Sequence, residues 1–373
     1  MPEALTAAGW RALLDGVTDH TIGVEEELML LDPETLDLLP AAARVHEELG
    51  DRVALRGELP AAQVETASPV CGTIAEAAAA LARARTTLAT GLAGWARLAS
   101  AGTHPFAAPE GAFRDDRKYD ALIEEFPWVL PRQLVFGMHV HVAVRGADRA
   151  LAVLNALRSH LPDIAALAGN APLHDGRDTG LASLRPKISE LLPRQGIPPA
   201  FPSWEARADY ERWGRRGGVF PAAGEPWWEL RAHDELGTIE LRVPDAQTTA
   251  EEAAGALAFA AGLVAWLADR HDQGEQLPVH DAIRIAENRW RAMRHGLDGT
   301  LLDLETGEPQ PTRERVRALI EQVAPAVERL GGGAELDHAR ELADRNGAER
   351  QRALAADAGP RAVVAWLADA FMP

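Results

Sequence analysis

The sequence has a single cysteine, Cys71, among 373 residues, so no disulfide can form within the chain. One thiol suits a protein that works in a reducing compartment. Basic residues are also scarce, because 38 Lys and Arg stand against 56 Asp and Glu and leave a formal charge of −18. Nucleic acids and anionic membranes are bound through basic patches. We therefore expect neither nucleic acid nor membrane among the partners.

Two further kinds of segment are missing. We find no basic-then-apolar leader and no apolar run that would span a bilayer, so we expect a cytoplasmic protein. The chain has no Gly-x-x-x-x-Gly-Lys-Ser/Thr segment, which excludes a P-loop. Glycines 331–333 follow a predicted helix instead of a strand, and they indicate the end of that helix.

The stretch from residue 21 to residue 31 has the alternation of a β-strand. Side chains of a strand point in turn to its two faces. Glu25 and Glu27 therefore share one face, whereas the other face is apolar except for Glu26. Two carboxylates on one sheet face repel each other unless solvent or a cation lies between them. For this strand alone, the simplest interpretation is a solvated face of an antiparallel sheet.

The same design recurs in other segments. Residues 134–144 predict a strand with histidines on one face and valines on the other. Residues 227–233 and 238–243 predict a hairpin around a glycine-containing turn. Together with Glu25 and Glu27, the polar side chains expected on one concave face are Glu65, His139, His141, Glu229, Arg231, Glu240 and Arg242. This repetition favours a binding site over a merely solvated face.

We predict an α+β fold in which a curved, largely antiparallel sheet of about six strands forms a funnel-like site and helices pack on its outer face. Residues 1–373 are expected to form one domain with a mostly helical C-terminal third (about 250–373). Residues 170–224 have the composition of a long loop, and such loops usually carry function or short elements of their own. A short strand is expected at residues 37–40, and helices at residues 3–16, 41–50, 74–99, 149–161, 250–269, 279–295, 312–330 and 335–370.

So many converging carboxylates cannot all stay ionised without cations. Carboxylate ligands suit Mg²⁺ or Mn²⁺, which bind nucleotide phosphates in many enzymes, and nearby arginines would hold an anionic substrate or a moving phosphoryl group. A second hypothesis is a zinc amidohydrolase or peptidase that uses His139 and His141. A third is a protein that binds a nucleotide or an amino acid without catalysis.

Several motifs carry a resemblance to a known family. They are Gly23-Val24-Glu25-Glu26-Glu27, Gln63-Val64-Glu65, residues 101–106, Gly137-Met138-His139-Val140-His141-Val142, residues 178–180 with 183–185, and residues 237–245. In combination they resemble the type 2 glutamate–cysteine ligase family, many of whose bacterial members are called carboxylate–amine ligases. The resemblance covers nearly the whole chain and implies a fold similar to the catalytic domain of glutamine synthetase.

The resemblance implies ATP-dependent activation of a carboxylate, typically the γ-carboxylate of glutamate, as an acyl phosphate that an amine such as cysteine attacks to form an amide. The implied cofactors are ATP and Mg²⁺ (or Mn²⁺), the partners are small-molecule carboxylates and amines, and a homodimer is possible. The implied metal ligands are Glu25, Glu27, Glu65 and Glu240. The catalytic residues would be Glu27, His139, Arg185 and Arg242. The residues that bind the nucleotide would be Glu25, Glu65, Arg231 and Glu240.

Overall fold

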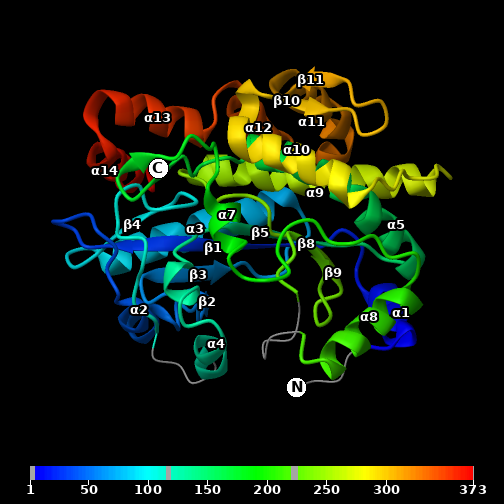
Figure 1. The fold of residues 1–373 in the computed structure, drawn as a ribbon, viewed down its shortest axis with the longest axis horizontal. Coiled ribbons are helices and arrows are strands. Elements are labelled where there is room, and N and C mark those ends of the chain that lie inside the picture. Colours follow the sequence, from blue (N-terminus) through cyan, green and yellow to red (C-terminus); the bar gives the residue numbers. More distant parts are fainter. Residues whose placement is uncertain (1–4, 115–118, 220–225, 373) are drawn as a thin grey trace.

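Seven antiparallel strands form the central sheet of the computed structural model, which describes residues 5–114, 119–219 and 226–372 (Figure 1). Hydrogen-bonded neighbours follow the order β2-β3-β1-β5-β9-β8, and β4 pairs with β1 outside this path. The strands are β1 (Ile22–Leu31), β2 (Leu55–Arg56), β3 (Gln63–Ala67), β4 (Arg97–Ala99), β5 (Met138–Ala143), β8 (Leu230–Ala232) and β9 (Thr238–Leu241).

The register of this sheet brings together residues that are far apart in the chain. Glu27 of β1 lies opposite Glu65 of β3. On the other side of β1, Glu25 lies opposite His139 of β5. His141 of β5 is in turn opposite Glu240 of β9. Directly opposed side chains in an antiparallel pair are about 5 Å apart at Cβ, so the strand alternation predicted from the sequence creates one polar face.

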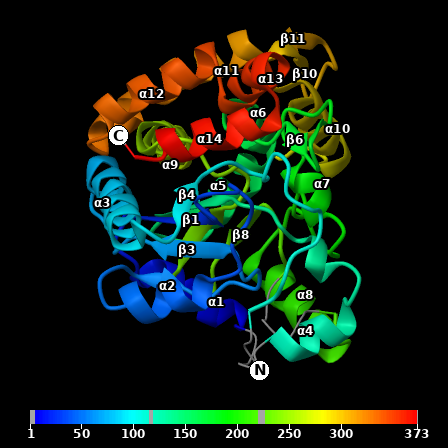
Figure 2. The same ribbon diagram turned by 90° about the vertical axis from the view of Figure 1, so that its left-hand side faces the viewer.

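Helices cover the apolar face of the sheet. Val24, Val140 and Leu241 share a core cluster with the apolar side chains of α9. Figures 1 and 2 show α9, α11 and α12 lying above the sheet, with α3 beside them. The helices of the N-terminal two thirds are α1 (Ala7–Gly16), α2 (Ala42–Leu49), α3 (Ile74–Leu92), α4 (Asp120–Glu125), α5 (Ala147–Leu157), α6 (Leu161–Leu167), α7 (Arg185–Ser189) and α8 (Trp204–Arg216).

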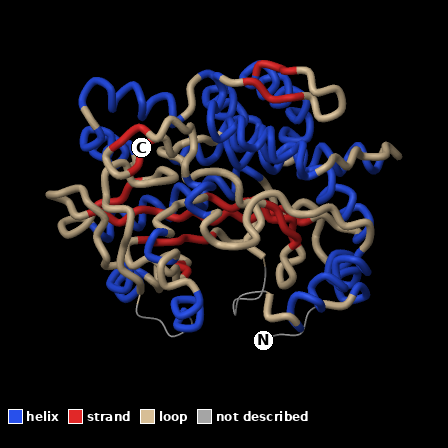
Figure 3. The backbone as a smooth tube through the Cα atoms, in the orientation of Figure 1, coloured by secondary structure: helices blue, strands red, loops and turns tan. Residues whose placement is uncertain are grey.

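The C-terminal third is almost wholly helical, as its composition predicts, and the tube view separates it from the strands below (Figure 3). Its helices are α9 (Ala250–Asp272), α10 (Ala282–His295), α11 (Thr312–Arg329), α12 (Gly333–Asp344), α13 (Gly347–Ala358) and α14 (Pro360–Ala370). Two small hairpins complete the described structure: β6 (Leu173–His174) with β7 (Arg177–Asp178), and β10 (Thr300–Leu302) with β11 (Pro309–Pro311).

The sequence predicted no apolar run that would span a bilayer, but α9 is long and apolar enough to cross one. However, 89% of its most apolar window is buried inside the protein, which is the burial of a core helix. A Cβ at Gly255 of α9 would lie 2.7 Å from the backbone nitrogen of Ala339 in α12. Glycine therefore lets the two helices approach closely, and the apolar surface of α9 faces protein.

One helix boundary was wrong, and it changes the strand count. We expected a helix through residues 74–99, but α3 ends at Leu92, and residues 97–99 form β4 beside β1. Gly94 has φ +98°, a left-handed conformation that ends the helix and that residues with a side chain rarely adopt. Good helix formers around it concealed this break, so the sheet has seven strands instead of about six.

Three smaller expectations also differ from the structure. Pro162 does not end the expected helix 149–161, because α5 ends at Leu157 and Pro162 lies in the first turn of α6, where proline is tolerated. The strand expected at 37–40 is a single bridge between Leu31 and Leu38. Residues 335–370 form three helices with breaks near Asn346 and Gly359. The long loop 170–224 carries β6, β7, α7 and α8, and its last five residues lie outside the described ranges.

Candidate active site

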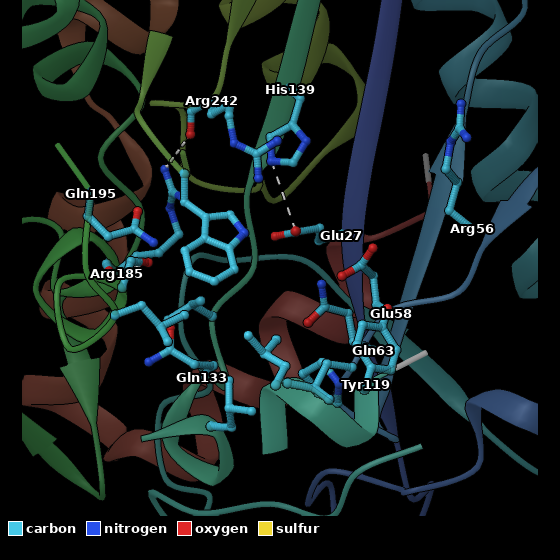
Figure 4. A pocket seen from close by; sticks show the side chains of 18 of the residues that line it. Glu27, Arg56, Glu58, Gln63, Tyr119, Gln133, His139, Arg185, Gln195 and Arg242 are labelled. Atoms are coloured by element: carbon cyan, nitrogen blue, oxygen red, sulfur yellow. Dashed lines mark hydrogen bonds and ion pairs between the residues drawn. The ribbon is translucent and has the colours of Figure 1, made fainter. Parts of the chain in front are cut away.

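A cavity of about 810 Å³ lies on the polar face of the sheet (Figure 4). Its walls include Glu27 from β1, His139 from β5, Arg231 from β8 and Arg242, which follows β9. Arg185, at the start of α7, lines it as well. These five are residues predicted from the sequence, and the fold brings all of them to one cavity.

The other three predicted residues, Glu25, Glu65 and Glu240, belong to two clusters of possible metal ligands within the described part of the chain. Glu25, His141 and Glu240 form the first, which we call the histidine cluster. Glu27, Glu58 and Glu65 form the second, the carboxylate cluster. In each cluster the three ligand atoms lie within 4.8 Å of one another. Five carboxylates and one imidazole therefore converge beside the cavity.

The interpretation of a solvated sheet face is wrong. Glu65 and Glu240 are only 4% and 1% exposed, and His139 and His141 are each 5% exposed. Buried charged groups are costly unless they are paired, hydrogen-bonded or bound to a metal. The two clusters meet this requirement in different ways.

In the histidine cluster, protein cations balance the carboxylates. Both Arg231 and Arg242 donate to the carboxylate of Glu240, with 2.5 Å between Nη1 of Arg242 and Oε1. Burial alone would raise the pKa of Glu240, but these two guanidinium groups hold its pKa well below its usual value. Burial also opposes ionisation of Glu25, yet the imidazoles of His139 and His141 hold the pKa of that carboxyl low. His139 Nδ1 lies 3.3 Å from Glu25 Oε2.

In the carboxylate cluster, like charges face one another. Burial and the neighbouring carboxylate of Glu58 raise the pKa of Glu65 well above its usual value. Burial likewise raises the pKa of Glu58, and the charge of Glu27 adds to this effect. Glu27 itself accepts a hydrogen bond from the backbone nitrogen of Gly137 at 2.5 Å. The positive charge of Arg242 offsets only part of this effect at Glu58, so the carboxyls of this cluster bind protons more readily than those of the histidine cluster.

Arg185 is held by an extensive set of contacts. Its Nε donates to Asp245 at 2.8 Å, and its Nη2 donates to the backbone oxygens of Arg242, Val243 and Pro244. Figure 4 shows its guanidinium on the side of the cavity opposite Glu58. Fixing two nitrogens in this way leaves the guanidinium in one orientation beside the cavity.

Two further glutamates line the cavity. Glu229 was expected on the face with the other glutamates, and it does line the cavity, but Nε and Nη2 of Arg289 bind its carboxylate at 2.5–2.9 Å. It belongs to neither ligand cluster. Glu58, which was not predicted as a site residue, is a member of the carboxylate cluster. Glu58 lies between β2 and β3, where strand alternation does not apply. In the sequence it could have been noticed only as an acidic residue shortly before the strand that carries Glu65.

Comparison with known proteins gives a consistent picture over nearly the full chain. Residues 21–363 match the family model of glutamate–cysteine ligase family 2. A Rubrobacter xylanophilus protein with the provisional name glutamate–cysteine ligase 2-3 is 38% identical over 360 residues, which cover 94% of this chain and 97% of that protein. A Thermobifida fusca protein with the provisional name glutamate–cysteine ligase 2 is 36% identical over 349 residues, 91% of this chain and 87% of that protein.

Solved structures share the fold at low sequence identity. The glutamate–cysteine ligase of Francisella tularensis, solved in complex with AMP, has a TM-score of 0.66 at 12% identity and aligns with 95% of this chain and 89% of its own. A bifunctional glutathione synthetase from Pasteurella multocida has a TM-score of 0.65 at 14% identity, with 98% of this chain and 53% of that chain covered. The match of the family model and the identity with these relatives establish that the chain belongs to glutamate–cysteine ligase family 2 and is an ATP-dependent carbon–nitrogen ligase.

Proposed function

We propose that this chain uses ATP to activate a carboxylate, such as the γ-carboxylate of glutamate or of a similar amino acid, as an acyl phosphate, and that an amine such as cysteine or another amino compound then attacks it. A carboxylate oxygen attacks the γ-phosphorus and ADP leaves. The amine nitrogen next attacks the acyl carbon, phosphate leaves, and the nitrogen loses a proton. The observation that carries this proposal is the pair of ligand clusters beside a cavity that is also lined by Arg185, Arg231 and Arg242.

The donor set fits divalent cations. Nε2 of His141 is buried and makes no hydrogen bond, although it lies 3.6 Å from Glu25. In the carboxylate cluster, the raised pKa values of Glu58 and Glu65 mark a surplus of negative charge. We therefore assign both clusters as Mg²⁺ or Mn²⁺ sites. When bound, such ions would neutralise the phosphates of the nucleotide.

The cavity arginines would hold the reacting anions. Arg242 and Arg231 share the carboxylate of Glu240, so their guanidinium groups stay ordered beside the ligand clusters. We assign Arg242 and Arg185 to the substrate carboxylate and the moving phosphoryl group, because guanidinium groups stay charged and form strong hydrogen bonds with such oxygens. Positioning and charge neutralisation are the main requirements of phosphoryl transfer.

His139 is placed for a proton transfer. Its Nδ1 lies 3.3 Å from Glu25 and its Nε2 lies 3.9 Å from Glu27, a contact drawn in Figure 4. In the neutral tautomer that carries its hydrogen on Nδ1, His139 donates a hydrogen bond to Glu25. Its Nε2 is then unprotonated and can accept a proton next to the cavity. We assign His139 to the proton that the attacking amine releases.

The remaining parts of the fold support one catalytic unit. We infer that the sheet forms a funnel around the cavity and that the chain acts as a single domain, because α9 packs directly on the strands that carry the site. We also propose a cytoplasmic location, which agrees with the single free cysteine, Cys71.

The zinc hydrolase hypothesis is less well supported. It requires His139 and His141 to share one ion, yet among the described residues each cluster contains at most one histidine, and His139 belongs to neither. Carboxylate-rich sets favour harder ions than zinc. Zinc bound in stoichiometric amount, with amide hydrolysis that ignores ATP, would instead support this hypothesis.

The test is ADP release from ATP and Mg²⁺ with panels of amino acids and amines, together with trapping of an acyl phosphate by hydroxylamine. We expect ADP release that requires an acid and an amine, and a hydroxamate of the activated acid. Glu27→Gln should abolish both products and leave the circular dichroism spectrum intact, because it removes a ligand of the carboxylate cluster. Full activity of this variant, or a wild-type protein that does not bind ATP with Mg²⁺, would refute the proposal.

A further inference from the structure

One glutamate of β1 faces away from the cavity. Glu26 lies between Glu25 and Glu27, and the alternation of the strand turns it toward the helical layer. There it meets Arg85 of α3, whose Nε and Nη2 donate to the two carboxylate oxygens at 3.0 and 2.6 Å. Both side chains are only 1% exposed. A buried, bidentate ion pair therefore lies directly beneath the strand that supplies a ligand to each cluster.

The same guanidinium holds a second segment. Arg85 donates to the backbone oxygens of Gln247 at 2.8 Å and Thr248 at 3.0 Å. That segment begins with Asp245, whose carboxylate accepts a hydrogen bond from the Nε of Arg185 at 2.8 Å. One side chain thus joins the strand of the carboxylates to the segment that orients Arg185 on the far side of the cavity.

Stability alone is a weak explanation for such a pair. The cost of desolvating two buried charges is large, and replacement by apolar residues of similar volume is often neutral or stabilising. A planar guanidinium that donates to four acceptors, by contrast, fixes the distances and angles between the segments that carry those acceptors. Displacement of reacting groups by about 1 Å can lower a rate about 100-fold.

We propose that Arg85 and Glu26 are positioning residues, which set the spacing between the ligand carboxylates of β1 and Arg185. The proposal rests on the function proposed above, since it assumes that these groups act on the same substrates. Neither residue lines the main cavity, so any effect on metal or substrate must pass through β1 and the segment from Asp245 to Thr248.

The chain provides a matched control pair. Arg315 of α11 binds Asp163 of α6 through Nε at 2.6 Å and Nη2 at 3.0 Å, and Asp163 is fully buried. This pair has the same bidentate form, but it joins two helices of the outer layer, and neither residue lines the main cavity or belongs to a ligand cluster. Arg315 is 20% exposed against 1% for Arg85, so its pair should contribute somewhat less to stability, and only the pair of Arg85 should contribute to function.

The experiment compares Arg85→Lys with Arg315→Lys, because lysine keeps the charge and loses the planar fork. Mn²⁺ affinity is measured by the paramagnetic resonance signal of the free ion, alongside the urea midpoint and kcat and KM for ADP release. We expect both variants to lose stability. Only Arg85→Lys should weaken Mn²⁺ binding, roughly 10- to 100-fold as for other residues that orient metal ligands, and lower kcat/KM.

A second pair of variants controls for the chance that the single substitutions simply unfold the protein. Glu26→Gln/Arg85→Met and Asp163→Asn/Arg315→Met remove both charges at once, so neither leaves an unpaired buried ion. The same shift in Mn²⁺ affinity is expected only for the first. Changes below about twofold in both Arg85 variants, or equal changes in the Arg315 variants, would overturn the inference. So would a wild-type protein that binds no Mn²⁺. A wild type that binds Mn²⁺ but releases no ADP would refute the proposed function, while the titration still decides the positioning role.

Discussion

The histidine cluster and the carboxylate cluster share one sheet face, but they manage their charge in opposite ways. Glu240 is held by Arg231 and Arg242, and its pKa is lowered. Glu65 faces Glu58, and its pKa is raised. The carboxyls of the first cluster therefore stay ionised within the protein, whereas those of the second bind protons more readily, and the proposed cation would displace these protons. We therefore expect stability to depend more on the first cluster, and affinity for the proposed metal to depend more on the second.

The largest effect is expected on the free energy of unfolding, which substitutions in the two clusters should change in opposite directions or by very different amounts. Glu240→Gln deprives two partly buried guanidinium groups of the buried carboxylate that they share, and breaking a buried pair costs up to about 3–5 kcal/mol. Glu65→Gln should leave the stability of the metal-free protein unchanged or raised, because it removes a repelled charge. Urea denaturation without metal measures both. Equal losses in the two variants would contradict the assigned difference, and neither variant should retain turnover.

Metal affinity should show the reverse order. Glu58→Gln removes a ligand from the cluster in which carboxylates face one another, and we expect Mn²⁺ binding to weaken at least about tenfold. His141→Asn, in the cluster with two arginines, should weaken it less. Titration with Mn²⁺ followed by paramagnetic resonance compares the two variants directly. A larger loss in His141→Asn would show that the histidine cluster is the tighter site.

The pH dependence sharpens the same contrast. Because the folded-state pKa of Glu65 is raised above its usual value of 4.5, its contribution to stability is complete below pH 4.5 and is lost as the pH rises through the raised pKa. Glu240, with its lowered pKa, contributes stability above pH 4.5 that is lost as the pH falls through its folded-state pKa. Metal-free protein should therefore lose thermal stability as the pH rises above 4.5, and saturating Mg²⁺ or the Glu65→Gln substitution should suppress this loss.

The smallest effect is expected at the edge of the histidine cluster. Arg56 lies 3.3 Å from Glu25, but its side chain is 57% exposed. Exposed ion pairs contribute about 0–1 kcal/mol and are screened by salt. Arg56→Ala should therefore change the urea midpoint little, and still less at high salt. A loss as large as that of Glu240→Gln would mean that the cluster depends on surface charge and would weaken the comparison.

Much of the site could be predicted because it follows strand alternation. Glu25 and Glu27 on β1, and His139 and His141 on β5, lie two residues apart, so their shared face is determined by the local sequence alone. What alternation cannot supply is the register between strands. The pattern placed Glu65 on the same face, but its position directly opposite Glu27 was predicted neither from the pattern nor from the resemblance.

The parts that were missed have a common physical cause. Glu58 comes from a connection between strands, where no periodicity fixes the direction of a side chain. Glu26 looked like an exception on an apolar face, because its partner Arg85 lies 59 residues away on a helix. The strand β4 was hidden by helix-forming neighbours, since a single left-handed glycine, Gly94, decides where α3 stops. Each depends on a contact or a backbone angle that propensity does not encode.

The positions of the ligands along the chain also have a consequence for the order in which the two clusters arise during synthesis. Glu27, Glu58 and Glu65 all lie early in the sequence, whereas the histidine cluster is incomplete until Glu240 has been synthesised. Chains are synthesised from the N-terminus at about 5–20 residues per second, so early segments wait for later ones. A nascent chain stalled before β8 would therefore carry the three glutamates of the carboxylate cluster without Arg231 and Arg242.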